Sequence, residues 1–195
     1  MKEIETTNRK VLQKLSTTEK QNSEIRNTES KGTVYIEEQY GMIKFERNIK
    51  HSKERIWETI TDKNEVFKWL PNYEGTFNGY KDGTIELINT VSGSRVTGKV
   101  LVYERYSVFE YEWFIAPNQM FPNGEPKSVI RWEIKQNDDL DSILIVTHSY
   151  LTKSTALAFA PGWHAYLDRL EAVLANRLPP DWVKRSAEVK KLYST

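Results

Sequence analysis

The sequence predicts an α+β domain in which an antiparallel sheet packs against one long amphipathic helix near the C-terminus. Within residues 156–177, apolar side chains recur at steps of four, three and four, the spacing of one helix face. These side chains are Trp163, Leu167, Leu170 and Leu174. Between Tyr73 and Tyr150, strand-like segments follow one another with turn residues between them and no helical pattern. Strands with such short connections pair antiparallel, so the sheet is the expected partner of the long helix.

Length, charge and cysteine content exclude several classes of protein. A chain of 195 residues with 38% hydrophobic residues suits one domain with a sizeable core and additional sequence at its ends. Its 28 Lys and Arg nearly balance 27 Asp and Glu, so it lacks the basic surface typical of nucleic-acid binding. The absence of cysteine excludes disulfides, thiolate catalysis and cysteine metal sites. The N-terminus has no apolar run suited to a signal peptide or a membrane span, so we expect a cytoplasmic protein.

Composition divides the chain into three parts. Residues 1–31 are polar and carry too few apolar side chains to fold independently, so we predict a flexible tail, with docking onto the domain or a partner as the alternative. Residues 32–177 form the predicted domain. Residues 178–195 form a C-terminal extension in which Asp181 caps a short amphipathic helix that carries Trp182.

Eight strands are predicted from alternating apolar and polar residues. The first two cover residues 33–39 and 42–49 and are joined near Gly41. The other six cover residues 75–80, 83–90, 94–103, 106–114, 127–135 and 141–151. Three aspartates in residues 137–142 lack the glycine and distal glutamate of a calcium loop, so this segment is predicted to be a hairpin turn.

Two short helices are predicted between the second and third strands. Ser52 is the expected N-cap of a helix over residues 53–61, whose apolar residues share one face. Asp62 is followed three positions later by a glutamate, a spacing typical of a capping box, and begins a helix over residues 64–70. Pro71 ends this second helix.

The long helix contains two residues that interrupt ordinary helical patterns. A proline is tolerated in a first turn or at a kink, so we expect the helix to start or bend at Pro161. Gly162 lets a backbone approach closely, so we expect the tightest contact with the strands there. The next residue, Trp163, is expected to pack on the sheet, and His164 is expected to face solvent.

Several sequence strings, in this order and spacing, resemble the SRPBCC or START-like superfamily, in its branch of activator of heat-shock-chaperone ATPase homologues (AHSA-like). The resemblance spans residues 33–177 and depends on the strings together, because no single one is diagnostic. They are FERNIKHSKERIWETITD (45–62), WLP (69–71), VTGKVLVYERYSVFEYEW (96–113), SVIRWEI (128–134), VTHS (146–149) and GWHAYLDRLEAVL (162–174).

This resemblance implies a helix-grip fold, START-like and similar to birch-pollen allergens. In such a fold a curved antiparallel sheet wraps the long C-terminal helix and leaves a cavity between them. The branch includes eukaryotic chaperone co-activators, in which the resembling domain follows a separate chaperone-binding domain. In this chain a polar tail stands in that place. Many single-domain relatives are similar to small-molecule binders.

Strand alternation identifies the side chains expected to face the cavity, where large rings with polar tips suit a ligand wall. From the strands these ligand-pocket candidates are Phe109, Tyr111, Trp113, Trp132, Val146, His148 and Tyr150. Trp69, Trp163, Tyr166 and Arg47 complete the set. For each ring, packing into the core is the alternative to a ligand wall.

The ionisable candidates have more than one interpretation. His148 is a candidate acid or base, with a buried and hydrogen-bonded structural histidine as the alternative. Arg47 has the parity to meet a carboxylate of a ligand or of the protein, with an extended side chain reaching the sheet edge as the alternative. His164 and Asp168 lie one helical turn apart, but two ligands without a third do not predict a metal site. We therefore predict no metal, no cofactor and no catalytic residue.

The favoured function is a small-molecule-binding protein that holds an apolar or aromatic, lipid- or polyketide-like ligand between sheet and long helix. One alternative is a protein-interaction role, such as chaperone ATPase stimulation, through residues 1–31 or 181–193. Another is a cyclase- or hydrolase-like enzyme that uses His148 in the same cavity. No nucleic-acid or membrane-spanning role is expected.

Overall fold

The structure, a computed structural model, describes residues 30–194 of the chain. The tail predicted for residues 1–31 therefore falls, up to residue 29, outside the described residues. Among the residues that are described, no helix has the length and apolar character needed to cross a membrane.

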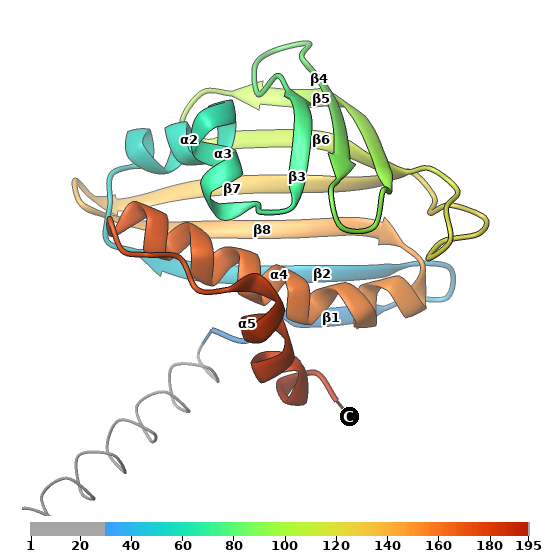
Figure 1. Cartoon of the computed structure of the whole chain (residues 1–195). Coiled ribbons are helices and arrows are strands. Elements are labelled where there is room, and N and C mark those ends of the chain that lie inside the picture. The colour runs from blue at the N-terminus through green and yellow to red at the C-terminus, as the bar shows by residue number, and fades with distance from the viewer. Residues whose placement is uncertain (1–29, 195) are drawn as a thin grey trace, which may run out of the picture. The chain divides into compact units, whose positions relative to one another are not determined.

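Eight antiparallel strands form one sheet in the order β1-β2-β8-β7-β6-β5-β4-β3 (Figure 1). Their bounds are β1 Thr33–Ile36, β2 Gly41–Ile49, β3 Tyr73–Phe77, β4 Thr84–Asn89, β5 Arg95–Glu104, β6 Val108–Ile115, β7 Ser128–Asp138 and β8 Asp141–Leu151. The last strand, β8, pairs with both β2 and β7, so it joins the N-terminal hairpin to the meander. The predicted α+β helix-grip fold is confirmed, and so is the predicted hairpin turn between β7 and β8.

The third strand begins two residues earlier than predicted. It covers Tyr73–Phe77, whereas the sequence pattern indicated residues 75–80. The chain turns directly after this strand, because the Asn78 N–H bonds to the Thr84 carbonyl at 3.0 Å and begins the connection to β4. Tyr73 and Phe77 consequently share one face of the strand, since side chains two positions apart point the same way.

Two short helices, α2 Lys53–Thr61 and α3 Lys63–Trp69, follow β2 as predicted. Both predicted caps are present: the Ser52 side chain accepts the Arg55 N–H, and the Asp62 side chain accepts two N–H groups in the first turn of α3. The Trp69 indole donates to the Thr59 carbonyl at 2.9 Å and locks the two helices together.

The long helix α4 covers Lys153–Leu174 and contains Pro161. A start at Pro161 is therefore wrong, because the helix begins eight residues earlier, where the Thr152 side chain accepts the Thr155 N–H. A proline inside a helix removes one backbone hydrogen bond. The buried side chains of Ala156 and Ala160 show that the turns before Pro161 nonetheless pack on the domain.

The close approach expected at Gly162 occurs at a different glycine. A Cβ atom placed on Gly41 would lie 2.5 Å from the Cβ of Ala156, so β2 and α4 meet most closely there. Gly162 instead faces away from the strands, toward Trp182 of the C-terminal extension. A Cβ atom on Gly162 would lie 3.2 Å from Cζ2 of that indole.

The C-terminal extension packs along the outer face of α4. It forms α5 Trp182–Val189 and a 3₁₀ turn η1 Lys190–Leu192, and Asp181 caps α5 as predicted. The Trp182 ring stacks on Tyr166 with centroids 5.2 Å apart, and its indole donates to the Gly162 carbonyl at 3.2 Å. Gly162 thus makes room for an aromatic anchor of α5.

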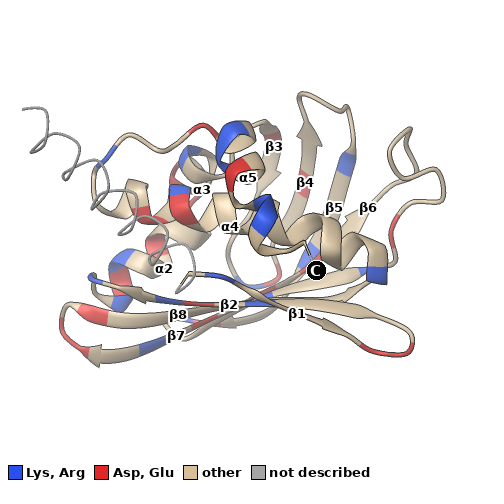
Figure 2. Cartoon of the chain, turned by 90° about the horizontal axis from the view of Figure 1, so that it is seen from below, with Lys and Arg blue, Asp and Glu red and all other residues tan. Residues whose placement is uncertain are grey.

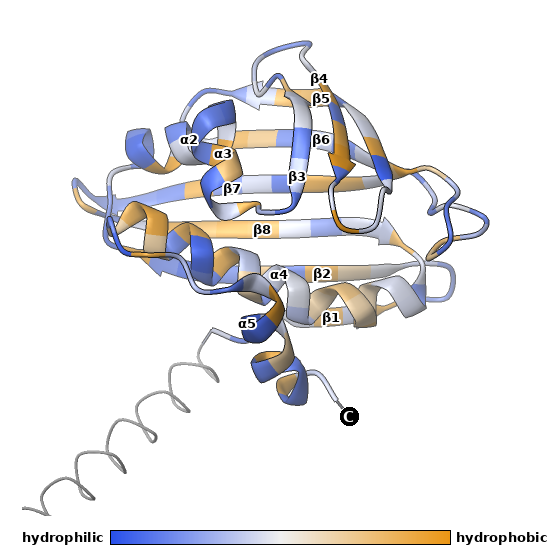
Figure 3. Cartoon of the chain, viewed as in Figure 1, coloured by the Kyte–Doolittle hydropathy of each residue, from blue (hydrophilic) through white to orange (hydrophobic). Residues whose placement is uncertain are grey.

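Apolar residues of the sheet and helices form one core between the sheet and α2, α3 and α4, and β8 is hydrophobic along much of its length (Figure 3). His164 also lies in this packed region with no exposed surface, so its predicted solvent-facing position is wrong. The reason is the extension: the Tyr193 hydroxyl lies 2.9 Å from His164 Nδ1 and closes over it.

We expect Trp163→Ala to lower the free energy of unfolding by about 3–5 kcal/mol, because it leaves a cavity and removes a buried hydrogen bond. Urea denaturation measures this loss. The control is Leu157→Ala on the same helix, which should cost under about 1 kcal/mol because Leu157 is 48% exposed. A Trp163→Ala loss no larger than that of the control would show that α4 is not held by the sheet through this residue.

Candidate functional site

The candidate site lies between α4 and the central strands of the sheet. The helix lies closest to β1 and β2, at one edge of the sheet. Toward β6 and β7, long aromatic side chains extend between helix and strands. The Trp132 and Trp163 rings, for example, meet edge to face with centroids 5.8 Å apart. This is the region in which the sequence analysis placed the ligand-pocket candidates.

The structure brings most of these candidates into two clusters of ring contacts, which the hydrogen bond from the Trp132 indole to the Tyr111 hydroxyl joins into one aromatic network. Trp132 contacts Trp69 at a centroid distance of 5.6 Å, and Trp163 contacts Tyr166 at 6.1 Å. On β6, neighbouring rings of the row Phe109, Tyr111 and Trp113 lie 5.0 and 6.3 Å apart. Val146 is buried beside Trp132 on the paired strand. The predicted inward parity of β6, β7 and the middle of β8 is therefore confirmed, while their contact with a ligand stays a prediction.

Sequence reasoning missed several aromatic members of this network, among them two on β3 and one on α4. Tyr73 contacts Trp113 at 5.9 Å and was missed because the third strand was predicted to begin after it. Phe77 contacts Tyr111 at 5.8 Å; it lies within the predicted strand but was not chosen as an inward-facing residue. Phe159 contacts His148 at 6.2 Å and Phe121 at 6.0 Å. Phe159 lies one turn before Trp163, so a helix pattern extended past Pro161 would have found it.

The phenol groups of the network are neutral hydrogen-bonding tips. Burial raises the pKa of Tyr73, Tyr111 and Tyr166 above the ordinary value for tyrosine. The Tyr111 hydroxyl lies 3.4 Å from the Trp132 indole nitrogen, which donates to it. In contrast, the Tyr166 hydroxyl and the Trp113 indole N–H have no hydrogen-bond partner among residues 30–194. Two polar groups in this aromatic region are therefore available to another molecule.

His148 is the centre of a chain of hydrogen bonds that fixes its protonation. The Trp163 indole can only donate, so His148 Nδ1, 3.0 Å away, is an unprotonated acceptor. The proton of the neutral ring is then on Nε2 and is donated to Ser128 Oγ at 2.8 Å. The Ser128 hydroxyl in turn donates to the Trp113 carbonyl at 2.7 Å. Every polar atom of the buried histidine ring is satisfied.

This arrangement differs from that of a catalytic serine and histidine. In such a pair the serine hydroxyl donates its hydrogen bond to the histidine, whereas the Ser128 hydroxyl donates to a backbone carbonyl and accepts a hydrogen bond from His148. Burial lowers the pKa of His148 to about 3, so the ring is neutral at physiological pH whether or not it is hydrogen-bonded. The interpretation of His148 as a buried structural histidine is confirmed. Ser128 shares the parity of Ile130 and Trp132, which is the signal that would have found it.

Tyr150 does not face the interior, so its predicted inward position is wrong. Its φ of 63° turns the side chain outward, where it is 54% exposed and contacts Tyr40 edge to face at 5.8 Å. The pairing of β2 with β8 shifts by one residue at this point, and Leu151 becomes the buried residue instead. A bulge of this kind breaks the simple alternation on which the prediction depended.

Arg47 does face inward, with the predicted parity, but it meets protein carboxylates. Its side chain is only 4% exposed, and its Nε lies 3.1 Å from Glu171 and its Nη2 3.9 Å from Asp168. The alternative that it extends to the sheet edge is wrong. Burial lowers the pKa of Arg47 and raises that of Glu171, as expected when charges leave water. Arg47 therefore lies under the C-terminal extension, apart from the aromatic network.

Asp168 connects this charged cluster to the extension. Arg185 of α5 donates to Asp168 at 2.6 Å, and His164 Nε2 lies 3.7 Å from the same carboxylate oxygen. Within the described part of the chain, no group of three or more His, Asp or Glu side chains is arranged to hold a metal ion. His164 and Asp168 instead contact the C-terminal extension, His164 through Tyr193 and Asp168 through Arg185.

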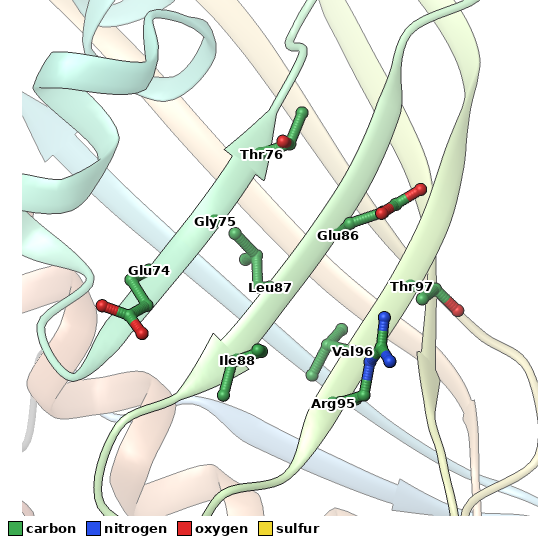
Figure 4. Close-up of a pocket in the computed structure, with 9 residues that line it drawn as sticks. All are labelled: Glu74, Gly75, Thr76, Glu86, Leu87, Ile88, Arg95, Val96 and Thr97. Atoms are coloured by element: carbon green, nitrogen blue, oxygen red, sulfur yellow. The ribbon is translucent and has the colours of Figure 1, made fainter.

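A separate surface pocket of about 350 Å³ lies over β3, β4 and β5 (Figure 4). It is lined by Glu74 and Glu86 together with Arg95, so charges of both signs share it. Gly75 on β3 has a φ of 124°, and a Cβ atom there would lie 2.2 Å from the Glu86 carbonyl oxygen, so the close approach of β3 and β4 requires glycine at this position. None of the predicted site residues lines the pocket.

Comparison with known proteins places the chain in one family. A family model described as Activator of Hsp90 ATPase homolog 1-like protein matches residues 50–175. No curated protein sequence matches the chain.

Solved structures with the same fold come from several bacteria. CalU16 from Micromonospora echinospora is 15% identical, with a TM-score of 0.59 over 84% of this chain and 92% of that one. The protein encoded by gene BPP1335 from Bordetella parapertussis is 23% identical, with a TM-score of 0.61 over 84% and 88% of the two chains. A conserved protein of unknown function, EF2215 from Enterococcus faecalis, is 18% identical, with a TM-score of 0.57 over 87% and 96%. At these identities the likeness shows the fold.

We expect the free energy of unfolding to fall when the pH is lowered from 7.5 to 5.0. The folded-state pKa of His148 is about 3, below its value of about 6.5 in an unfolded chain, so the unfolded state binds more protons in this range. His148 alone then accounts for a loss of about 2 kcal/mol at pH 5. Urea melts measure the loss. Nitrogen-15 spectra of the native imidazole check the cause, and a native-state titration midpoint above pH 6 would contradict it.

We expect Arg47→Ala to cost about 2–3 kcal/mol of unfolding free energy, because it leaves the partly buried Glu171 without its partner. Arg47→Met should cost less, since methionine keeps an apolar stem over the Phe45 ring that the guanidinium now covers at 5.2 Å. Urea denaturation of both variants measures the difference. Equal losses, or an alanine loss under about 1 kcal/mol, would show that the ion pair contributes little.

Proposed function

Because the chain belongs to the family of Activator of Hsp90 ATPase homolog 1-like proteins, we propose that its aromatic network binds a small, neutral, largely apolar or aromatic molecule between the sheet and α4. The molecule would be lipid- or polyketide-like in character. The observation that carries the proposal is a pair of polar groups in the aromatic network, the Tyr166 hydroxyl and the Trp113 indole N–H, that have no hydrogen-bond partner within residues 30–194.

The chemistry of the lining supports a neutral ligand. Trp113 is 7% exposed, and the phenols around it have pKa values raised by burial, so a charged group placed among them would lose its hydration without gaining a partner. Within residues 30–194 the buried cation is Arg47, which lies apart from the network and is paired with Glu171 and Asp168. Apolar walls with a few convergent polar groups are typical of small-molecule sites.

The two unpartnered groups also suggest which atoms the ligand presents. An indole N–H only donates, and a phenol hydroxyl donates or accepts. A carbonyl or ether oxygen on an apolar ring system would accept a hydrogen bond from either group. Catalysis in this site is not proposed, since both ring nitrogens of His148 are engaged by Trp163 and Ser128.

We expect a neutral flavonoid to raise the melting temperature and a fatty-acid carboxylate of similar size to raise it less. Saturation at a hundredfold excess over the Kd adds about 2.7 kcal/mol of stability. Tyr166→Phe should weaken flavonoid binding about 5- to 10-fold through loss of one hydrogen bond. The matched control is Tyr80→Phe, because Tyr80 is 55% exposed.

Tryptophan fluorescence titration measures the affinities of the parent and both variants. If no neutral aromatic or apolar compound in a panel of polyketides and flavonoids stabilises the protein, the proposal fails. Equal affinities of Tyr166→Phe and Tyr80→Phe would place any binding elsewhere on the molecule.

A further inference from the structure

A second pocket, of about 460 Å³, lies on the surface where α2, α3 and the end of α4 meet. It is lined on one side by Arg55 of α2, Lys68 of α3 and Arg169 of α4, and on the other by residues 176–179, which follow α4. Its volume falls within the usual range for small-molecule sites. It is distinct from the aromatic network, because none of the network's rings lines it.

The charged residues that line this pocket are all cationic. The four are Arg55, Lys68, Arg169 and Arg177. Figure 2 shows that α2 and α3 carry acidic as well as basic residues. Acidic residues of these two helices form ion pairs with Arg55 and Lys68. Arg55 pairs with Glu58 and Glu65, and Lys68 pairs with Glu65. These carboxylates offset the positive charge of Arg55 and Lys68, on the α2 and α3 side of the pocket. The positive charge of Arg169 and Arg177 remains.

Arg169 and Arg177 supply the remaining charge. Neither forms an ion pair within residues 30–194. Arg169 is held in place by the carbonyls of Trp69, Lys68 and Pro180, one bond from each of its three nitrogens. A guanidinium has five N–H donors, so one N–H on each terminal nitrogen remains for another acceptor. Burial lowers the pKa of Arg169, and the attraction of the Asp181 carboxylate offsets only part of that effect.

Apolar side chains complete the pocket. Val173 is buried at its base, and Leu178 at its rim is 94% exposed, with Pro179 following it. An exposed leucine beside a fixed guanidinium fits a molecule that is anionic at one end and apolar at the other. Guanidinium groups bind planar carboxylate and tetrahedral phosphate oxygens with two parallel hydrogen bonds.

From this combination we propose that the pocket binds a small amphipathic oxyanion, a phosphate monoester or carboxylate borne on a short apolar group. The two remaining N–H groups of Arg169 and the side chain of Arg177 bind the oxyanion. Val173, Leu178 and Pro179 cover the apolar part. This site is independent of the neutral ligand proposed for the aromatic network.

Isothermal titration of the full chain with octyl phosphate, below its micelle concentration, tests this proposal. We expect saturable binding, weaker binding of inorganic phosphate, and at least a 5-fold loss of octyl phosphate affinity in Arg177→Gln. Arg177 is used because it is exposed, whereas Arg169 anchors three carbonyls and its loss would disturb the fold. The matched control is Lys99→Gln on β5, an exposed cation that lines neither pocket.

Absence of saturable binding, or equal losses in Arg177→Gln and Lys99→Gln, would overturn the proposal. Sedimentation with phosphatidylglycerol vesicles distinguishes two sources of the same chemistry. Vesicle binding that depends on Arg177 assigns the oxyanion to a lipid headgroup. Octyl phosphate binding without vesicle binding assigns it to a free metabolite, and either result supports the site.

Discussion

The rest of the structure depends on one chain of hydrogen bonds that ties α4 to three adjacent strands. It starts at the Trp163 indole, passes through the His148 ring on β8 and the Ser128 hydroxyl on β7, and ends at the Trp113 carbonyl on β6. Each donor in the chain has one acceptor, so the helix has a single satisfied position against the sheet. An unpaired member would leave a buried polar group at a cost of about 1–3 kcal/mol. A polar chain inside an apolar core thus fixes the helix register that packing alone leaves less specified.

The opposite face of α4 is covered by the chain's own C-terminus. Trp182 is seated at Gly162, Arg185 is paired with Asp168, and Val189 is fully buried. The helix is therefore enclosed on two sides, which explains why residues such as His164 have no exposed surface. Arg47 links the two sides, because it rises from β2 beneath the helix to the carboxylates that face α5.

The two proposed sites follow from opposite electrostatic environments. Among the aromatic rings, burial keeps the phenols neutral, and the Tyr166 hydroxyl and the Trp113 N–H have no partners within residues 30–194. At the end of α4, backbone carbonyls hold the charged Arg169 guanidinium in the same pocket as Arg177. Desolvation penalises a charged ligand in the first environment, while the unpaired cations attract one in the second. One helix therefore presents two kinds of binding chemistry at different points along its length.

The sequence by itself determined the order of elements, the strand pairing direction, the caps at Ser52, Asp62 and Asp181, and the inward parity of β6 and β7. These features depend on local periodicity and capping chemistry, which neighbouring residues determine. Tertiary structure alone decided that His148 accepts from Trp163, that His164 is buried, and that Tyr150 points outward. Each of these depends on a partner or a register shift distant in the sequence: Trp163 from α4, Tyr193 from the extension, and the bulge where β8 pairs with Gly41. Alternation predicts which face a side chain takes, but only the folded chain determines what lies opposite it.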